Sequence, residues 1–81
     1  MRVTVRLFAR LRELAGRESW DIELPAGSTA ADAWASVAAD TPTLAPFDRA
    51  ISVAVNASFA RMSRPLTEGD DVAFLPPVSG G

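Results

Sequence analysis

The last six residues, 76–81, are the part of this sequence best suited to chemistry. Pro76 and Pro77 have fixed φ angles and stiffen the start of this segment. Gly80 and Gly81 have no side chain, so they can enter a channel too narrow for a Cβ atom. Six extended residues reach about 20 Å. The segment can therefore present the terminal carboxylate of Gly81 at a distance from the domain, although a Gly-Gly pair alone also fits a frayed chain end.

The side-chain types that most often carry catalysis are missing from the chain. There is no His, Cys, Tyr or Lys, and all eight basic residues are Arg. Their absence removes the usual general base, the thiol nucleophile, the Schiff-base amine and the strongest zinc ligands. A catalyst built from its own side chains would have only Asp, Glu, Arg, Ser and Thr, so we expect no bound metal.

The composition describes one small domain. The 81 residues are 48% hydrophobic and 22% charged, with a net charge of −2. An acidic chain with dispersed Arg residues is a poor partner for nucleic acid, but it suits a basic protein. The N-terminus shows no apolar leader, and no stretch approaches the length of a membrane span. We therefore expect a cytoplasmic protein with no nucleic-acid or membrane partner.

Hydrophobic periodicity predicts the secondary structure. Apolar residues alternate with polar ones in the segments expected to be strands, and they recur at helical spacing over 30–40, after Ser28 or Thr29 as the cap. A short helix is expected before Gly16. The stretch 41–49 contains two prolines and is predicted to be an irregular crossover that Leu44 and Phe47 attach to the core. The expected strands cover 2–8, 19–24, 51–55, 59–62 and 72–75, and the expected helices 9–15 and 30–40.

This order of elements predicts an α+β fold of the ubiquitin-like β-grasp type, with one main helix packed on one face of a mixed sheet. The first and last strands should lie side by side at the centre. The domain should cover residues 1–75, followed by a flexible C-terminal Gly-Gly tail over 76–81.

Three apolar residues remain once the core face of the sheet has been assigned. Strict alternation sends Phe8 and Leu75 to the face opposite the helix, and Phe59 is reachable from the adjoining turn. A contiguous exposed apolar patch is typical of a partner site. Alternatively, the loop 41–49 or the helix 9–15 could cover Phe8 and Leu75.

The charged residues give weaker signals. Arg12, Arg61 and Arg64 could pair with acidic residues of a partner, although exposed Arg is usually only solvated. Glu68, Asp70 and Asp71 form a carboxylate cluster, but no other ligand type is present to complete a metal site. We interpret them as turn and solubility residues.

Three segments of the sequence resemble a known family. The run Leu66-Thr67-Glu68-Gly69-Asp70-Asp71-Val72-Ala73-Phe74-Leu75-Pro76-Pro77-Val78-Ser79-Gly80-Gly81 is similar to the C-terminal signature of molybdopterin synthase small subunits, which are sulfur carriers. The opening Leu7-Phe8-Ala9-Arg10-Leu11-Arg12-Glu13-Leu14-Ala15-Gly16 and the pair Val55-Asn56 also resemble that family. The chain departs from it mainly at Asp71, where Glu is common, at Trp34, where an aliphatic residue is usual, and in its lack of Lys.

The resemblance implies a mechanism in which Gly81 is the reactive residue. An E1-like adenylating enzyme would use ATP to form a glycyl adenylate, and a sulfurtransferase would convert it to a thiocarboxylate. The tail Pro76, Pro77, Val78, Ser79 and Gly80 would thread into the large synthase subunit. There Gly81 would donate sulfur to cyclic pyranopterin monophosphate, with the catalytic side chains on the large subunit and no cofactor bound by the carrier.

The resemblance also implies the partners. Phe8, Phe59 and Leu75 would dock on the large subunit and on the activating enzyme, and two small subunits would assemble with two large ones. Three other functions stay open. They are a sulfur carrier for thiazole synthesis in thiamin formation, a ubiquitin-like protein modifier, and an interaction module with an inert tail.

Overall fold

The computed structural model of the chain describes residues 1–77. The end of the predicted tail, Val78, Ser79, Gly80 and Gly81, lies outside the described residues. The elements within residues 1–77 are β1 (Arg2–Leu7), α1 (Ala9–Ala15), β2 (Ser19–Glu23), α2 (Ala30–Asp40), the 3-10 helix η1 (Pro42–Phe47), β3 (Ser52–Val55), β4 (Ser58–Ala60) and β5 (Asp71–Leu75).

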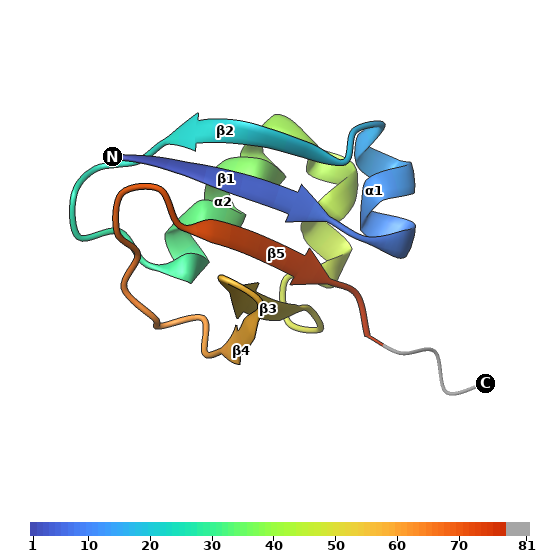
Figure 1. Cartoon of the computed structure of the whole chain (residues 1–81). Helices are drawn as coiled ribbons and strands as arrows, with labels where there is room; N and C mark the ends of the chain where they lie inside the picture. The colour runs from blue at the N-terminus through green and yellow to red at the C-terminus, as the bar shows by residue number, and fades with distance from the viewer. Residues whose placement is uncertain (78–81) are drawn as a thin grey trace.

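The strands form one mixed sheet in the order β2-β1-β5-β3-β4 (Figure 1). β5 pairs in parallel with β1 and antiparallel with β3, while β1 and β2 form an antiparallel hairpin. The predicted adjacency of the first and last strands is therefore confirmed, as is the ubiquitin-like β-grasp fold. Because β1 and β5 are parallel neighbours, the chain begins at one end of these strands and β5 finishes at the opposite end (Figure 1).

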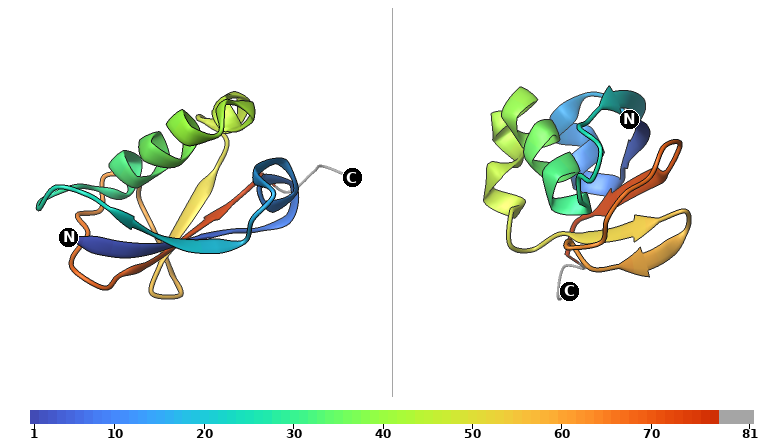
Figure 2. Two further views of the ribbon diagram at one scale, coloured as in Figure 1. Left: turned by 90° about the horizontal axis from the view of Figure 1, so that it is seen from above. Right: turned by 90° about the vertical axis from the view of Figure 1, so that its left-hand side faces the viewer.

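Helix α2 lies across one face of the sheet (Figure 2). The hydroxyl of Thr29 accepts a hydrogen bond from the backbone N–H of Asp32, whose carboxylate accepts one from the backbone N–H of Thr29. This capping box fixes where the helix begins. Trp34 packs edge-on against Phe74 of β5, with ring centroids 5.2 Å apart. No helix of residues 1–77 is long and apolar enough to cross a bilayer.

The stretch predicted to be an irregular crossover contains η1, so this prediction was wrong. Pro42 begins the 3-10 helix and Leu44 is fully buried in the core. Proline suits the first helical turn because its missing N–H would have no partner there. Asp48 follows η1, and its carboxylate accepts a 2.7 Å hydrogen bond from the indole N–H of Trp34. The segment is therefore attached to α2 as well as to the core.

The hairpin between β3 and β4 has the two-residue loop Asn56-Ala57, in which both residues have positive φ angles, 51° and 71°. Positive φ angles at both positions define a type I′ turn. Ala57 lacks the conformational freedom of Gly, which is the usual residue at its position. β4 covers residues 58–60 and not the predicted 59–62, because Ser58 pairs with Val55 directly after this tight turn.

We expect Ala57→Gly to raise the free energy of unfolding by about 0.5–1 kcal/mol, because Gly adopts a positive φ without steric cost. Chemical denaturation followed by circular dichroism measures the change. The matched control is Ala54→Gly in β3 of the same hairpin, where Gly should lower stability by a similar amount. A loss of stability in both variants would contradict the turn assignment.

Asp70 connects the loop before β5 to this hairpin. Its carboxylate accepts hydrogen bonds from the backbone N–H of Thr67 at 2.8 Å and from the side-chain amide of Asn56 at 2.9 Å. The side-chain oxygen of Asn56 accepts in turn from the backbone N–H of Asp71 at 2.9 Å. The bonds from Thr67 and Asn56 favour the ionised form and hold the pKa of Asp70 below its ordinary value of 3.8, against the opposing effect of burial.

The lowered pKa of Asp70 predicts acid sensitivity. The ionised carboxylate stabilises the fold above pH 3.8, and this contribution is lost as the pH falls from 3.8 through the lower pKa of the folded state. We expect Asp70→Asn to cost about 1–3 kcal/mol at pH 7 and to flatten the decline in stability below pH 4. Urea titrations between pH 2 and 7 measure both effects. Asp40→Asn, at an exposed carboxylate, is the control and should change little.

Candidate functional site

The parallel pairing of β1 and β5 brings Phe8 and Leu75 together. Leu7 and Phe74 are register partners that point into the core, so the next residue on each strand belongs to the opposite, outer face. Phe8 follows β1 in an extended conformation, and Ala9, with a φ angle of 51°, then turns the chain into α1. The sequence placed Phe8 and Leu75 correctly on the outer face.

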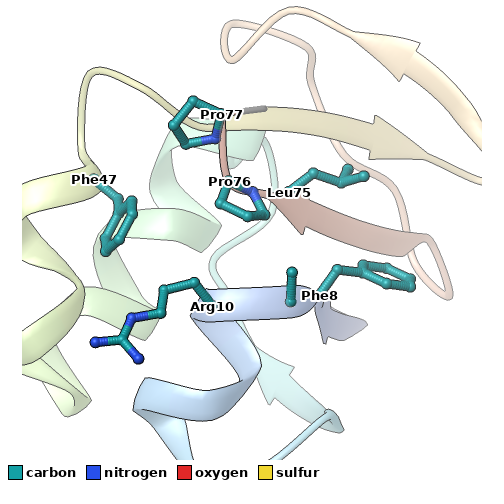
Figure 3. Close-up of a pocket in the computed structure, with 7 residues that line it drawn as sticks. Phe8, Arg10, Phe47, Leu75, Pro76 and Pro77 are labelled. Atoms are coloured by element: carbon teal, nitrogen blue, oxygen red, sulfur yellow. The ribbon is translucent and has the colours of Figure 1, made fainter. Parts of the chain in front are cut away.

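A hollow of about 610 Å³ opens beside these residues (Figure 3). It lies where the end of β1, the start of α1, the end of η1 and the end of β5 meet, and among residues 1–77 its only charged lining group is the guanidinium of Arg10. Figure 3 shows Pro76 and Pro77 above the start of α1, with the aromatic rings of Phe8 and Phe47 on opposite sides. The lining residues are Phe8, Ala9, Arg10, Phe47, Leu75, Pro76 and Pro77.

The two segments that could have covered Phe8 and Leu75, residues 41–49 and the helix α1, instead contribute to the walls of the hollow. Phe8 keeps 43% of its surface exposed, so neither 41–49 nor α1 buries it. Phe47, assigned to the core from the sequence, packs against the core and also lines the hollow. Arg10 was missed altogether. No local pattern marks these two residues, because they meet only through the packing of α1 beside η1.

Phe59 lies apart from the hollow. It is 78% exposed on β4, opposite Ala54 of β3, whereas Leu75 pairs with Ser52, two residues earlier on β3. Strand β3 therefore separates Phe59 from Leu75. Both residues belong to the outer face of the sheet, where Ala54 is also register partner to Ala73 of β5. The predicted trio thus shares one face, but only Phe8 and Leu75 line the same hollow.

The described part of the tail begins at the hollow. Pro76 and Pro77 follow β5 without a connecting loop and line the hollow with Leu75. Since β5 is hydrogen-bonded on both sides, by β1 and β3, the root of the tail is held by the centre of the sheet. The predicted threading residues Val78, Ser79 and Gly80, and the reactive Gly81, lie beyond the described residues.

Some of the charged residues named in the sequence analysis make ion pairs or hydrogen bonds in the structure. Arg12 lies 4.0 Å from Glu18, while Arg61 and Arg64 make no ion pair within residues 1–77. The carboxylate of Glu68 accepts a hydrogen bond from the backbone N–H of Arg2, and that of Asp71 pairs with the Arg6 guanidinium at 2.7 Å. Within the described chain, no group of three His, Cys, Asp or Glu side chains could hold a metal ion.

This geometry suits binding, because the hollow is apolar and lies at the root of a narrow tail. The sequence profile described as the ThiS family matches residues 5–81 of the chain. The chain belongs to the ThiS family. The match extends across the hollow and the whole tail, so both features are part of the ThiS-family region.

Relatives of known name agree with this ThiS-family assignment. The molybdopterin synthase sulfur carrier subunit of Escherichia coli is 36% identical, over 98% of this chain and 99% of its own length. Among solved structures, SAMP1 from Haloferax volcanii has a TM-score of 0.88 at 29% identity, covering 100% of both chains. A putative molybdopterin converting factor subunit 1 from Pyrococcus furiosus has a TM-score of 0.85 at 30% identity, covering 96% of this chain and 99% of its own. These likenesses agree with the β-grasp fold of the ThiS-family chain.

Proposed function

We propose that this chain is the sulfur carrier subunit of a molybdopterin synthase. The observation that carries the proposal is the central strand β5, which runs directly into a proline-stiffened tail root beside an apolar hollow. The named relative from Escherichia coli, which matches almost end to end, supports the same function. In this proposal the domain over 1–75 binds the partner proteins, and the tail over 76–81 delivers the sulfur.

The chemistry takes place at the carboxylate of Gly81. A carboxylate is a poor electrophile, so the activating enzyme joins it to the AMP portion of ATP and releases pyrophosphate. A sulfurtransferase that carries a persulfide attacks the acyl carbon through its outer sulfur and displaces AMP, which leaves an acyl disulfide between Gly81 and the donor. A thiol then attacks the donor's sulfur in this disulfide, forms a new disulfide with it and releases the Gly81 thiocarboxylate. The thiocarboxylate then gives its sulfur to cyclic pyranopterin monophosphate, and the carboxylate is restored. This chain binds no cofactor, and ATP is used by the activating partner.

The three partner proteins follow from this sequence of reactions, and the two-to-two assembly is what the resemblance to molybdopterin synthase small subunits implies. An E1-like adenylating enzyme, a sulfurtransferase and the large synthase subunit must each reach Gly81, and two carriers assemble with two large subunits. Phe8, Leu75 and Phe59 supply the apolar contact on the carrier. Burial of one of the two phenylalanine rings contributes about 1.5–3 kcal/mol to the binding free energy. A contribution of this size stabilises a complex that must still separate after each sulfur transfer.

Intact-mass measurement tests the proposed function. After incubation with the cognate activating enzyme, ATP and a sulfur source, the chain should gain about 16 Da, because sulfur replaces one oxygen. Adding the large synthase subunit and the pterin substrate should then return the original mass and yield molybdopterin. A chain that gains the mass but yields no molybdopterin when a large subunit and the pterin substrate are added would instead be a carrier for another pathway, such as thiazole synthesis.

A second candidate is a ubiquitin-like modifier, because solved structures of Haloferax volcanii SAMP1 are also named small archaeal modifier protein 1. In that case Gly81 would form amide bonds with lysine residues of other proteins. Tryptic peptides carrying a remnant of this tail on lysine, found in cells that express the tagged chain, would favour it. Their absence in cells that make molybdopterin would favour the carrier.

A further inference from the structure

Arg10 differs in its surroundings from the arginines that form ion pairs. It is exposed, it lines the hollow, and within residues 1–77 it makes no ion pair. In Figure 3 its side chain extends below the ring of Phe47, on the side of the hollow away from Phe8. The described ion pairs of arginine side chains involve Arg2, Arg6, Arg12 and Arg17.

The position of Arg10 is not explained by the stability of α1. Arg10 is the second residue of this helix, at the end where the partial charge of the helix is positive. A basic residue is favoured at the opposite end of a helix, and Arg12 already occupies the last turn. The guanidinium of Arg10 therefore gains nothing from its own helix and faces an apolar surface.

The length of the tail determines what can cover this surface. Four residues follow Pro77, and four extended residues span at most about 14 Å. A protein that holds Gly81 in its active site must therefore come within that distance of the hollow. The apolar walls suit an apolar side chain of such a protein, and the guanidinium suits a carboxylate next to it.

We propose that Arg10 is a specificity-determining residue of the carrier, which pairs with an aspartate or glutamate of the large synthase subunit while the hollow takes up a neighbouring apolar side chain. This inference rests on the proposed function. The carrier has a net charge of −2, so the chain as a whole weakly attracts basic groups. A single cation beside the tail root reverses this preference locally and so sets the orientation in which the tail enters the partner.

Binding of the complete chain to the large synthase subunit, measured over a range of salt concentrations, tests the inference. We expect Arg10→Glu to weaken binding about tenfold or more, and Arg10→Gln to weaken it less while reducing its salt dependence. Arg10→Lys should retain part of the affinity, because the charge remains but the planar guanidinium does not. Phe47→Ala should weaken binding without changing the salt dependence.

Arg2→Gln is the matched control, because Arg2 carries the same charge at the start of β1, whereas Arg10 lies just beyond its end. The Arg10 and Arg2 variants should keep the unfolding midpoint of the original chain, since both arginines are exposed. Phe47→Ala should lower it, because Phe47 packs against the core. An Arg10→Glu chain that binds as well as Arg2→Gln would overturn the role of Arg10 and leave the carrier function intact. If the chain alone self-associates and Arg10→Glu abolishes this self-association, the hollow binds a second copy of the chain, and the inference is overturned. Failure of the original chain to bind the large subunit would overturn the proposed function as well.

Discussion

Deletion of Gly81 is expected to abolish sulfur transfer while leaving the fold unchanged. The shortened chain still ends in a carboxylate, but this group lies about 3.5 Å short of the position at which the activating enzyme acts. A displacement of about 1 Å can already cost a hundredfold in rate, so we expect a loss well beyond that. The measurement is the gain of about 16 Da with the activating enzyme, ATP and a sulfur source.

Gly81→Ala is the companion variant, because it keeps the length of the tail and adds one Cβ at the reactive end. It should impair transfer, because the channel of the partner is expected to suit a residue without a side chain. The loss should be smaller than for the deletion, because the terminal carboxylate keeps its distance from the domain. Both variants should unfold at the same denaturant concentration as the original chain. A deleted chain that still gains sulfur at the original rate would show that the terminal glycine is not the reactive residue.

Phe8→Asp is expected to weaken binding to the large subunit about tenfold to a hundredfold, because it replaces one buried ring in the complex with a charge. The free chain should lose little stability, since 43% of Phe8 is already exposed. Calorimetric titration measures the affinity, and thermal unfolding of the free chain measures the stability. Ser19→Asp adds the same charge at an exposed site on β2 and serves as the control.

Phe59→Asp tests whether the part of the outer face around Phe59 contributes to binding independently of the hollow. Phe59 lies across β3 from the hollow, so its variant reports whether the complex extends beyond the root of the tail. A large loss of affinity in Phe8→Asp alone would limit the contact to the hollow. Equal affinity of Phe8→Asp and the original chain would contradict the assignment of this surface.

Local sequence patterns, which span only a few neighbouring residues, predicted most of the fold. Alternation placed Val3, Val5 and Leu7 in the core, and Gly16, with a φ angle of 73°, ends α1 as expected. The outer position of Phe8 and Leu75 followed from the same alternation, because a strand reverses its side-chain direction at every residue. Local periodicity is sufficient wherever one face of an element is buried.

Features that depend on contacts between distant segments could not be predicted in the same way. Phe47 and Arg10 are 37 positions apart in the numbering and meet only because η1 packs beside α1. Phe59 was expected within reach of Phe8 and Leu75 from the adjoining turn, but in the sheet order β4 lies beyond β3, so β3 separates Phe59 from Leu75. The short 3-10 helix was obscured by its two prolines, which usually indicate irregular structure.

The position of β5 between β1 and β3 also has a mechanical consequence. A force on the tail, as when it is drawn out of a narrow channel, acts along β5 and therefore across the hydrogen bonds on both of its sides. These bonds bear the load together in shear, whereas a strand peeled from an edge would lose them one after another. The tail can thus be pulled repeatedly without unravelling the domain to which it is attached.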